Sequence, residues 1–463
     1  MGRSRSDRKV RCREMAAFSG KGIALLLATL EEQERSSGPM EWHRPANAEA
    51  ASLAVPKRGH VLSTVVEVYG KPIREAVSAL SASLDERECT QLRGQLLSPR
   101  PERPEKNFER PDCEMVAWAI VSMWVVGVAV EELRPEASLA DAERWFFGVE
   151  AFTPLLSRAV ITEAEASLRS AVDIEAFHQL LPYILDPHGP GSRLSVRRDP
   201  STRTARTRKR SEGVFYTPGD VAQYMARTCI AEFDSASPPT VFDPACGTGV
   251  FLRAALREIL HLDPNKDAYS AACDCLFGAD IDPWPLDAAA FVLLADTWGD
   301  VEGQAATPAE AWGRIRNNLA CVDTLRIDPA ADCVPQRASG TRVCLSQLFP
   351  LLSSGPAVIL GNPPYADIGH RSDIGDVGSI FKTLAVKASA NAEIYLTFIE
   401  QMLRLANTER CAASLVLPLS LACNVGRQFS TARELISKTR GRWRFAFFDR
   451  EPHALFGEDV KTR

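Results

Sequence analysis

The stretch that decides the fold reads Val241-Phe242-Asp243-Pro244-Ala245-Cys246-Gly247-Thr248-Gly249-Val250-Phe251. A short apolar run ends in an acidic residue, and two glycines separated by one residue precede a helical pattern. Glycine lets the backbone approach a ligand closely, and the first turn of a helix offers free amide groups. The stretch therefore predicts a strand, a ligand-binding turn and a helix. A bare Gly-x-Gly is weak evidence, whereas the complete string is far more specific.

Outward from this turn, apolar runs of strand length alternate with helical patterns from residue 211 onward. The expected strand–helix pairs are 240–242 with 250–260, 275–281 with 286–294, and 357–360 with 392–405, followed by a strand at 413–417. Such alternation predicts a parallel sheet with helices on both faces. Ligands of these sheets bind at the carboxyl ends of the strands, so the chemistry is expected in the turns there.

Two further acids follow apolar runs. Asp280 ends the second run, in Phe277-Gly278-Ala279-Asp280-Ile281, and an acid at that place can bind the two hydroxyl groups of a ribose. An isolated acid there would more often be solvated, but the neighbouring glycine turn favours ribose binding. Asp323 is the candidate acid of a third strand, placed to accept a hydrogen bond from an adenine amino group.

The most informative turn is Val358-Ile359-Leu360-Gly361-Asn362-Pro363-Pro364-Tyr365. The two prolines restrict the backbone, so they hold the Asn362 amide and the Pro363 carbonyl rigidly at the end of an apolar strand. These two oxygens can accept both hydrogens of an exocyclic NH₂ group and aim its nitrogen at an electrophile. Tyr365 offers an aromatic face for a planar substrate. A purely structural Pro-Pro turn would not explain the asparagine.

Composition limits the class of protein. In 463 residues, 45% are hydrophobic and 24% charged, which excludes a wholly disordered chain and allows two to three domains. A net charge of −5 means that nucleic-acid binding would need local patches. The apolar run 115–130 is shorter than the ~20 residues that span a bilayer, so we expect a buried helix, no membrane partner and a cytoplasmic protein. The 12 cysteines lack zinc spacing, which predicts free thiols and no metal site.

Breaks in the pattern divide the chain into four segments. We expect a disordered tail (1–50), a helical N-terminal domain (51–190), a basic linker (191–211) and a catalytic domain (212–463). The linker's basic residues suit a solvated linker or a strap that contacts phosphates. Residues 427–444 carry six basic residues and one acid, Glu434, and fit a solvated helix face and a DNA-backbone surface equally well.

From about residue 211, the chain resembles the adenine-specific DNA methyltransferases of bacterial restriction–modification systems, including the methyltransferase subunits of large restriction complexes. Three strings carry the resemblance in the family's order: Phe215-Tyr216-Thr217-Pro218, the string from Asp243 to Gly249, and Asn362-Pro363-Pro364-Tyr365. It implies the S-adenosylmethionine-dependent methyltransferase fold of the α/β class. That fold is a Rossmann-like, mixed but mostly parallel sheet of seven strands, of which we expect the last to be missing here.

The resemblance also implies roles for single residues. Asn362, Pro363, Pro364 and Tyr365 would be catalytic, and Tyr365 and Phe456 would stack on an adenine that has been turned out of the duplex. S-adenosylmethionine is the implied cofactor, and the residues implied to contact it are Tyr216, Thr217, Pro218, Asp243, Ala245, Gly247, Gly249, Asp280, Ile281 and Asp323. The implied chemistry consists largely of positioning and needs no metal.

Double-stranded DNA is the implied substrate, within restriction–modification or phage defence. Full enzymes of the family carry a target-recognition region after the catalytic core, and this sequence ends at Arg463 before such a region. Two expectations stay open: the chain is a truncated or split gene product, or a partner, such as a separate specificity or restriction subunit, supplies recognition. Two alternatives stay open. The turn at 362–365 suits any planar NH₂ group, so the substrate could be a protein glutamine amide or an RNA base, although the string at 215–218 favours DNA. A non-catalytic DNA-binding subunit of a multi-subunit complex is the other.

Overall fold

The computed structural model describes residues 41–43, 72–96, 111–133, 181–182, 184–185, 217, 219–234, 237–281, 283–303, 308–329, 342–365, 380–385, 393–407 and 409–446. The predicted site residues Tyr216, Pro218 and Phe456 lie outside these ranges, as does the whole segment 191–211.

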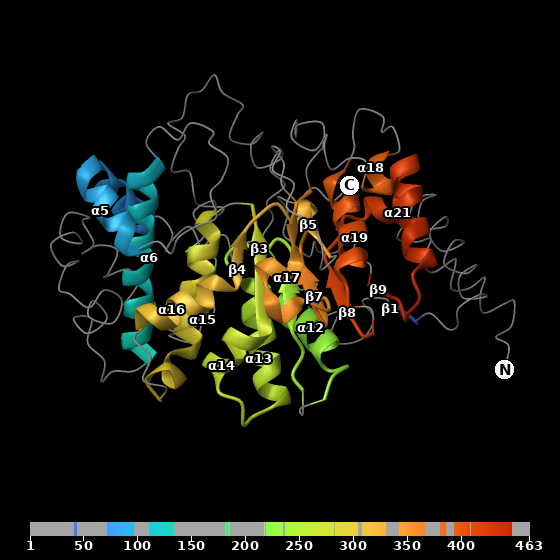
Figure 1. The fold of residues 1–463 in the computed structure, drawn as a ribbon, viewed down its shortest axis with the longest axis horizontal. Coiled ribbons are helices and arrows are strands. Elements are labelled where there is room, and N and C mark those ends of the chain that lie inside the picture. The colour runs from blue at the N-terminus through green and yellow to red at the C-terminus, as the bar shows by residue number, and fades with distance from the viewer. Residues whose placement is uncertain are drawn as a thin grey trace, which may run out of the picture.

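The central sheet has five strands in the order β4-β3-β2-β7-β8 (Figure 1). All its pairings are parallel. The strands are β2 (Val241–Asp243), β3 (Leu276–Asp280), β4 (Leu319–Cys321), β7 (Val358–Gly361) and β8 (Ala412–Leu415). The predicted α/β class with a mostly parallel sheet is confirmed. The resemblance implies a mixed sheet of seven strands without the last one, whereas the described residues place these five strands in the central sheet, all paired in parallel.

Helices connect the strands, as the alternation predicts. Before and after β2 lie α12 (Gly219–Ile230), α13 (Val250–Leu262) and α14 (Ala268–Cys275). After β3 come α15 (Pro283–Gly303) and α16 (Pro308–Asn317), and after β4 come η1 (Thr324–Arg326), α17 (Leu345–Leu348) and η2 (Pro350–Leu352). The later helices are α18 (Lys382–Ala385), α19 (Ile394–Leu405), α20 (Ser420–Cys423) and α21 (Arg427–Lys438).

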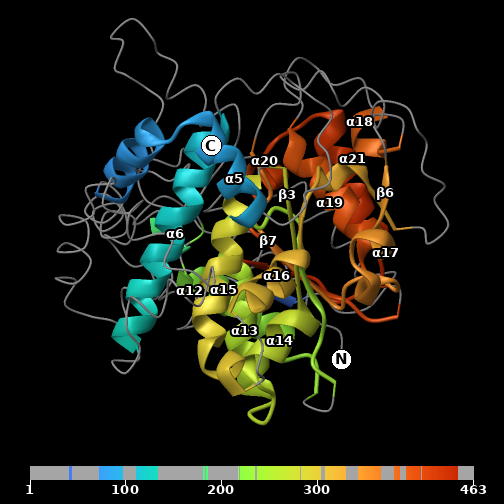
Figure 2. The same cartoon turned by 60° about the vertical axis from the view of Figure 1, so that its left-hand side comes forward.

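Successive strand residues face opposite sides of the sheet, and each side has its own core. Val241, Leu276 and Val358 belong to the larger core, with α12, α13 and α15. Phe242 and Phe277 belong to a second core on the other side, with α17, η2 and α19. The ring of Phe349 fills that second core, with its centroid 5.9 Å from Phe242 and 5.5 Å from Phe277. Figure 2 shows the two helix layers on either side of the strands.

The N-terminal helices join the larger core. Residues 72–83 are helical, and α5 (Glu86–Leu96) and α6 (Pro111–Leu133) follow. The apolar run of α6 is buried from Val116 to Ala129 and packs against α15. The predicted buried helix is therefore confirmed. Among the described residues, no helix is long and apolar enough to cross a membrane.

Two short strand pairs lie outside the central sheet. β5 (Ile327–Asp328) pairs with β6 (Val343–Cys344), and β1 (Glu41–His43) pairs with β9 (Arg444–Ala446). β1 falls within 1–50, the segment expected to be a disordered tail, so at least these three residues form a strand. The short sequence of β1 does not by itself predict a strand, and β1 forms one by pairing with the backbone of β9.

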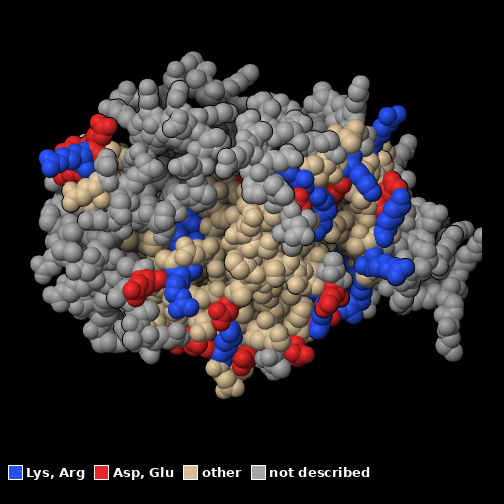
Figure 3. All heavy atoms as spheres, viewed as in Figure 1, with Lys and Arg blue, Asp and Glu red and all other residues tan. Residues whose placement is uncertain are grey.

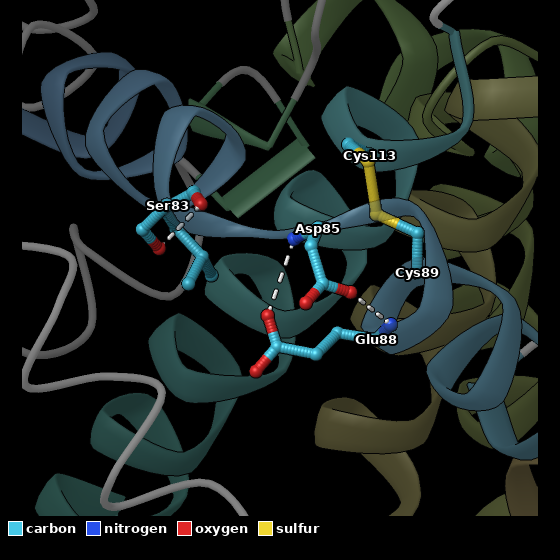
Figure 4. Close-up of a disulfide and its surroundings, with 6 residues drawn as sticks. Ser83, Asp85, Glu88, Cys89 and Cys113 are labelled. Atoms are coloured by element: carbon cyan, nitrogen blue, oxygen red, sulfur yellow. Dashed lines mark hydrogen bonds between the residues drawn. A yellow bond between two sulfur atoms is a disulfide. The ribbon is translucent and has the colours of Figure 1, made fainter.

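A disulfide links α5 to α6 through Cys89 and Cys113, which are 24 residues apart (Figure 4). The prediction that the cysteines are free thiols is therefore wrong for this pair, and Cys344 is also in a disulfide. The described cysteines that are free are Cys229, Cys246, Cys273, Cys275, Cys321, Cys411 and Cys423. Sequence spacing could not find the pair, because it is the packing of two helices that brings the two cysteines together. Beside the disulfide, Asp85 and Glu88 cap the start of α5 reciprocally.

We expect the double substitution Cys89→Ala with Cys113→Ala to lower the free energy of unfolding by about 3 kcal/mol, because a cross-link restricts the unfolded chain. Urea denaturation without reductant measures this loss. The candidate site should keep its ligand affinity, because the bond joins only α5 and α6. Alkylation of the unfolded wild type without reductant provides the direct check, and labelling of both cysteines would contradict the disulfide.

Candidate functional site

The centre of the sheet is a topological switch point. From β2, the chain first adds β3 and β4 on one side and later adds β7 and β8 on the other. In such sheets, ligands bind outside the carboxyl ends of the strands where the order reverses. β2 and β7 are direct neighbours, with Phe242 opposite Ile359. The glycine turn after β2 and the Asn-Pro-Pro-Tyr turn after β7 therefore start side by side.

The two glycines of the turn have different surroundings. Gly247 (φ 50°) and Gly249 (φ 81°) both adopt the left-handed conformation that favours glycine. A Cβ atom on Gly249 would lie 3.1 Å from the Cβ of Ala289, so this glycine is needed for the packing of α13 on α15. A Cβ atom on Gly247 would meet nothing within 4 Å. Gly247 therefore leaves space at the carboxyl edge that a ligand can fill.

Asp243 is fully buried at the end of β2. Its Oδ1 accepts a hydrogen bond from the Ala245 amide at 3.1 Å, and its Oδ2 has no hydrogen-bond partner among the described residues. Burial raises the pKa of this carboxyl well above its usual value, the Ala245 amide lowers it, and the charge of Asp280 raises it again. A buried carboxyl oxygen without a partner is costly unless a ligand or a proton satisfies it.

Asp280 and Ile281 are the residues predicted to contact the ribose and the adenine of the cofactor. Asp280 is at the tip of β3, and its Oδ2 accepts a hydrogen bond from the Gly247 amide at 2.9 Å. This contact ties the second strand to the glycine turn. Ile281 is 48% exposed, which is unusual for a large aliphatic side chain beside buried strands. Their roles in binding stay predictions.

Asp323 follows β4, but its carboxylate has local partners. Oδ1 accepts a hydrogen bond from the Leu325 amide at 3.1 Å, and Oδ2 lies 3.9 Å from the Arg326 Nε. Asp323 therefore caps the short helix η1. An acid directly after a strand can equally cap the turn that follows, and the sequence pattern does not distinguish these uses. Its predicted contact with adenine remains a prediction.

Asn362 connects the first and third strings of the sequence motif. Its Nδ2 donates a hydrogen bond to the Oγ1 of Thr217 at 3.1 Å, across 145 residues of chain. Thr217 is only 4% exposed and lies two residues before α12, which packs against α13 and β7. The structure therefore brings Thr217, Asn362 and the glycine turn to one edge of the sheet. Pro363 is buried, and Pro364 is half-buried.

Tyr365 lies with its hydroxyl beside Asn362. The hydroxyl is in hydrogen-bonding contact with the Asn362 Oδ1 and lies 3.0 Å from the Val416 carbonyl oxygen. The ring meets Tyr395 edge-on, with the centroids 6.1 Å apart. Burial, and secondly the neighbouring Tyr395, raise the pKa of the Tyr365 hydroxyl, so it stays a neutral donor. Stacking of a base on this ring stays a prediction.

Two polar residues that sequence reasoning missed, Thr324 and Gln401, form a chain of hydrogen bonds that ends at the glycine turn. The Oγ1 of Thr324 donates a hydrogen bond to the Pro244 carbonyl at 2.5 Å. The Nε2 of Gln401 donates to the carbonyls of Thr324 and Ile327, at 2.8 Å and 2.7 Å. Gln401 is fully buried in α19. The one available signal was a polar residue on the apolar face of an amphipathic helix.

The basic residues of 427–444 only partly form a free surface. Lys and Arg gather near α18 and α21 on the face shown in Figure 3. However, Arg433 is buried and donates to the carbonyls of Leu421 and Asn424, at 2.8 Å and 3.0 Å. Lys438 pairs with Glu434, and Arg442 pairs with Glu232. These three basic side chains thus have protein partners, which favours a structural role for them. Among the residues that the structure describes, no group of acidic, His and Cys side chains could hold a metal ion.

A parallel sheet with helices on both faces, a glycine turn at its switch point and an acid at the tip of the next strand define a Rossmann-like α/β protein of the methyltransferase fold class. The sequence comparisons are more specific. Residues 202–294 match the family model of the N-6 DNA methylases, and residues 274–451 match that of the Eco57I restriction-modification methylases. The C-terminal part of the chain is therefore similar to these two families of DNA methylases.

Solved structures of similar proteins are distant in sequence. The DrdV–DNA complex is 16% identical (TM-score 0.44), and the match covers 79% of this chain and 36% of that one. The type ISP restriction-modification enzyme LlaBIII bound to DNA is 14% identical (TM-score 0.35), with 78% of this chain and 24% of that one covered. A modification subunit of a putative type I restriction enzyme from Vibrio vulnificus is 15% identical (TM-score 0.34), with 90% and 75% covered. The chain thus spans about a third or less of the first two proteins. No match was found among curated proteins.

Proposed function

We propose that this protein is a site-specific DNA methyltransferase that transfers a methyl group from S-adenosylmethionine to the exocyclic amino group of adenine. The observation that carries the proposal is the contact between Thr217 and Asn362, 3.1 Å apart, beside the turn that starts after Asp243. It joins Thr217 of the first string to Asn362 of the third, beside the glycine turn of the second string at the switch point of the sheet. DNA as the substrate, a cytoplasmic location and a separate specificity or restriction subunit belong to the same proposal.

The residues at the glycine turn fit S-adenosylmethionine. Gly247 faces open space, and the Asp243 Oδ2 is buried without a partner among the described residues. A cationic ligand with hydrogen-bond donors would satisfy that oxygen. We assign the ribose hydroxyls to Asp280 and one face of the adenine ring to the exposed side chain of Ile281. When bound, the sulfonium supplies a methyl group that is already activated for transfer.

The residues of the chain would position the target amine and accept its hydrogen bonds. The Asn362 Oδ1 and the Pro363 carbonyl would each accept one hydrogen of the target NH₂ group, which turns the nitrogen lone pair toward the methyl group. A carbonyl oxygen has two lone pairs, so the Asn362 Oδ1 can accept from the Tyr365 hydroxyl and the substrate together. The target base would leave the duplex at an unstacking cost of about a few kcal/mol. The proton lost from the amine passes to solvent after transfer.

Incubation with tritiated S-adenosylmethionine tests the substrate class. Tritium should enter double-stranded DNA, and not RNA or protein, when the chain is incubated with all three. Label in the protein fraction would support glutamine methylation instead. Tight donor binding without label in any fraction would support a non-catalytic subunit.

We expect Gly247→Ala to weaken donor binding at least about 10-fold, because the added methyl group enters the space assigned to the donor. Gly249→Ala should mainly reduce stability, by more than the ~1–2 kcal/mol of left-handed strain alone, because Ala289 is in the way. Gly313→Ala, in open space on α16, is the control and should raise stability by about 0.5–1 kcal/mol. Calorimetric titration and urea denaturation measure both quantities. Unchanged donor affinity in Gly247→Ala would contradict the assigned position.

We also expect donor binding to release a proton from Asp243, since a cationic ligand stabilises the ionised carboxylate. Affinity should therefore rise with pH until the pH passes the raised pKa of Asp243. In the free protein, the raised pKa of Asp243 means that the folded state holds this proton more tightly than the unfolded state does. The free energy of unfolding should therefore fall as the pH rises above the unfolded pKa of about 3.9, whereas an acid with a lowered pKa would have the opposite effect. Asp243→Asn should therefore be more stable than wild type at neutral pH.

Calorimetry in two buffers with different ionisation enthalpies counts the released protons. The wild type should show a buffer-dependent binding heat, whereas any residual binding by Asp243→Asn should show none. Equal heats for the wild type in both buffers would show that Asp243 does not change its protonation.

A further inference from the structure

Two hydroxyl groups hold the side-chain amide of Asn362 from opposite ends. The Thr217 Oγ1 accepts a hydrogen bond from Nδ2, and the Tyr365 hydroxyl contacts Oδ1. Thr217 is buried, and the helix that follows it packs on α13 and β7. The position of the Thr217 hydroxyl is therefore set by the helix layer and not by the turn that carries Asn362.

The amide of Asn362 can adopt two orientations. Rotation by half a turn about the last side-chain bond exchanges the oxygen and the nitrogen with little change in shape. The Tyr365 hydroxyl has one hydrogen and two acceptors within reach, Asn362 Oδ1 and the Val416 carbonyl, which is 3.0 Å away. If that hydrogen goes to Val416, the Tyr365 oxygen can accept from an amide N–H, which favours the rotated amide. Tyr365 alone therefore does not determine where Oδ1 points.

We propose that Thr217 is a positioning residue for methyl transfer, whose hydroxyl is hydrogen-bonded to the Asn362 Nδ2 and, together with the Tyr365 hydroxyl at the other end, holds the plane of the amide so that its oxygen can reach the target amine. This inference rests on the proposed function. It gives Thr217 a role toward the acceptor base that is separate from any contact with the methyl donor. It also connects Thr217, two residues before α12, directly to the catalytic turn.

Two substitutions separate this role from simple packing. Thr217→Val keeps the shape of the side chain and removes the hydroxyl, whereas Thr217→Ser keeps the hydroxyl and removes a methyl group. We expect kcat of Thr217→Val to fall by about 10²-fold, as misplacement of a reacting group does. KM for DNA should change much less, and Thr217→Ser should restore most of kcat. A wild-type kcat in Thr217→Val, or equal losses in both variants, would overturn the proposal.

A second measurement does not depend on activity. The side-chain NH₂ group of Asn362 gives a pair of ¹⁵N–¹H NMR signals, identified by their loss in Asn362→Ala. Thr217→Val should shift this pair, and Thr217→Ser should leave it near the wild-type position. An unshifted pair in Thr217→Val would rule out the contact. A wild type that transfers no methyl group would instead refute the proposed function, and the NMR result would still decide whether Thr217 orients Asn362.

Discussion

Substitution of Asn362 by alanine is expected to lower methyl transfer at least about 10²-fold while leaving donor affinity nearly unchanged. Asn362 follows β7, whereas the turn that we assign to the donor follows the neighbouring strand β2. Removal of the Asn362 side chain should therefore not disturb the donor turn. The loss arises because the target amine then has one acceptor instead of two and is no longer held in line with the methyl group. Single-turnover methyl transfer and calorimetric donor binding, measured on the same preparation, give both numbers.

Asn265→Ala is the matched control for this experiment. Asn265 is exposed in the turn between α13 and α14, at the opposite end of α13 from the glycine turn. It should keep wild-type transfer and stability. Near-normal turnover in Asn362→Ala would remove asparagine from the mechanism, and loss of donor binding would mean that its main role is structural.

The second large effect concerns stability. Asp296→Ala should lower the free energy of unfolding by about 3–5 kcal/mol, because it removes the carboxylate that neutralises the buried guanidinium of Arg253. Arg253 Nε and Nη2 donate to the two Asp296 carboxylate oxygens, at 2.6 Å and 2.9 Å, and both side chains are less than 10% exposed. The pair joins α13 to α15. Since α13 starts at Gly249, loosening it should also weaken donor binding.

Two variants show whether burial is the cause. Glu434→Ala breaks an exposed pair with Lys438 on α21 and should cost less than about 1 kcal/mol. Arg253→Met combined with Asp296→Leu removes both buried charges and should recover much of the stability that Asp296→Ala loses. Urea denaturation of all three provides the comparison. A loss below about 1 kcal/mol in Asp296→Ala would mean that the pair is solvated in solution.

The sequence predicts the order of the sheet elements well, because strands, helices and turns leave local patterns. The expected strands near 241, 276, 358 and 412 and the helices that follow the first three are all present. The glycine turn could also be predicted from its local sequence, because the φ values of 50° at Gly247 and 81° at Gly249 favour glycine. The helical N-terminal segment was predicted as helical, but not its shared core with α15. The signal was available: the apolar residues of α15 are spread around the helix and do not form one stripe, and such a helix must be covered on more than one side.

The contacts that join the site are not local, so the sequence could not predict them. Thr217 and Asn362 are 145 residues apart, and Thr324 and Pro244 are 80 apart. Each depends on how helices pack on the sheet, which residue patterns do not specify. Asp323 shows that a local pattern can also be ambiguous, because an acid at the end of a strand fits both a ligand contact and the cap of η1.

The most direct test of the central claim is nucleoside mass spectrometry of double-stranded DNA after incubation with S-adenosylmethionine that carries a deuterated methyl group. The chain should be assayed alone and together with the products of its neighbouring genes. The site at the ends of β2 and β7 predicts deuterated N6-methyladenine with wild type and none with Asn362→Ala. Deuterium on cytosine, or no deuterated base from a protein that binds the donor, would contradict the assignment of this site to adenine methylation.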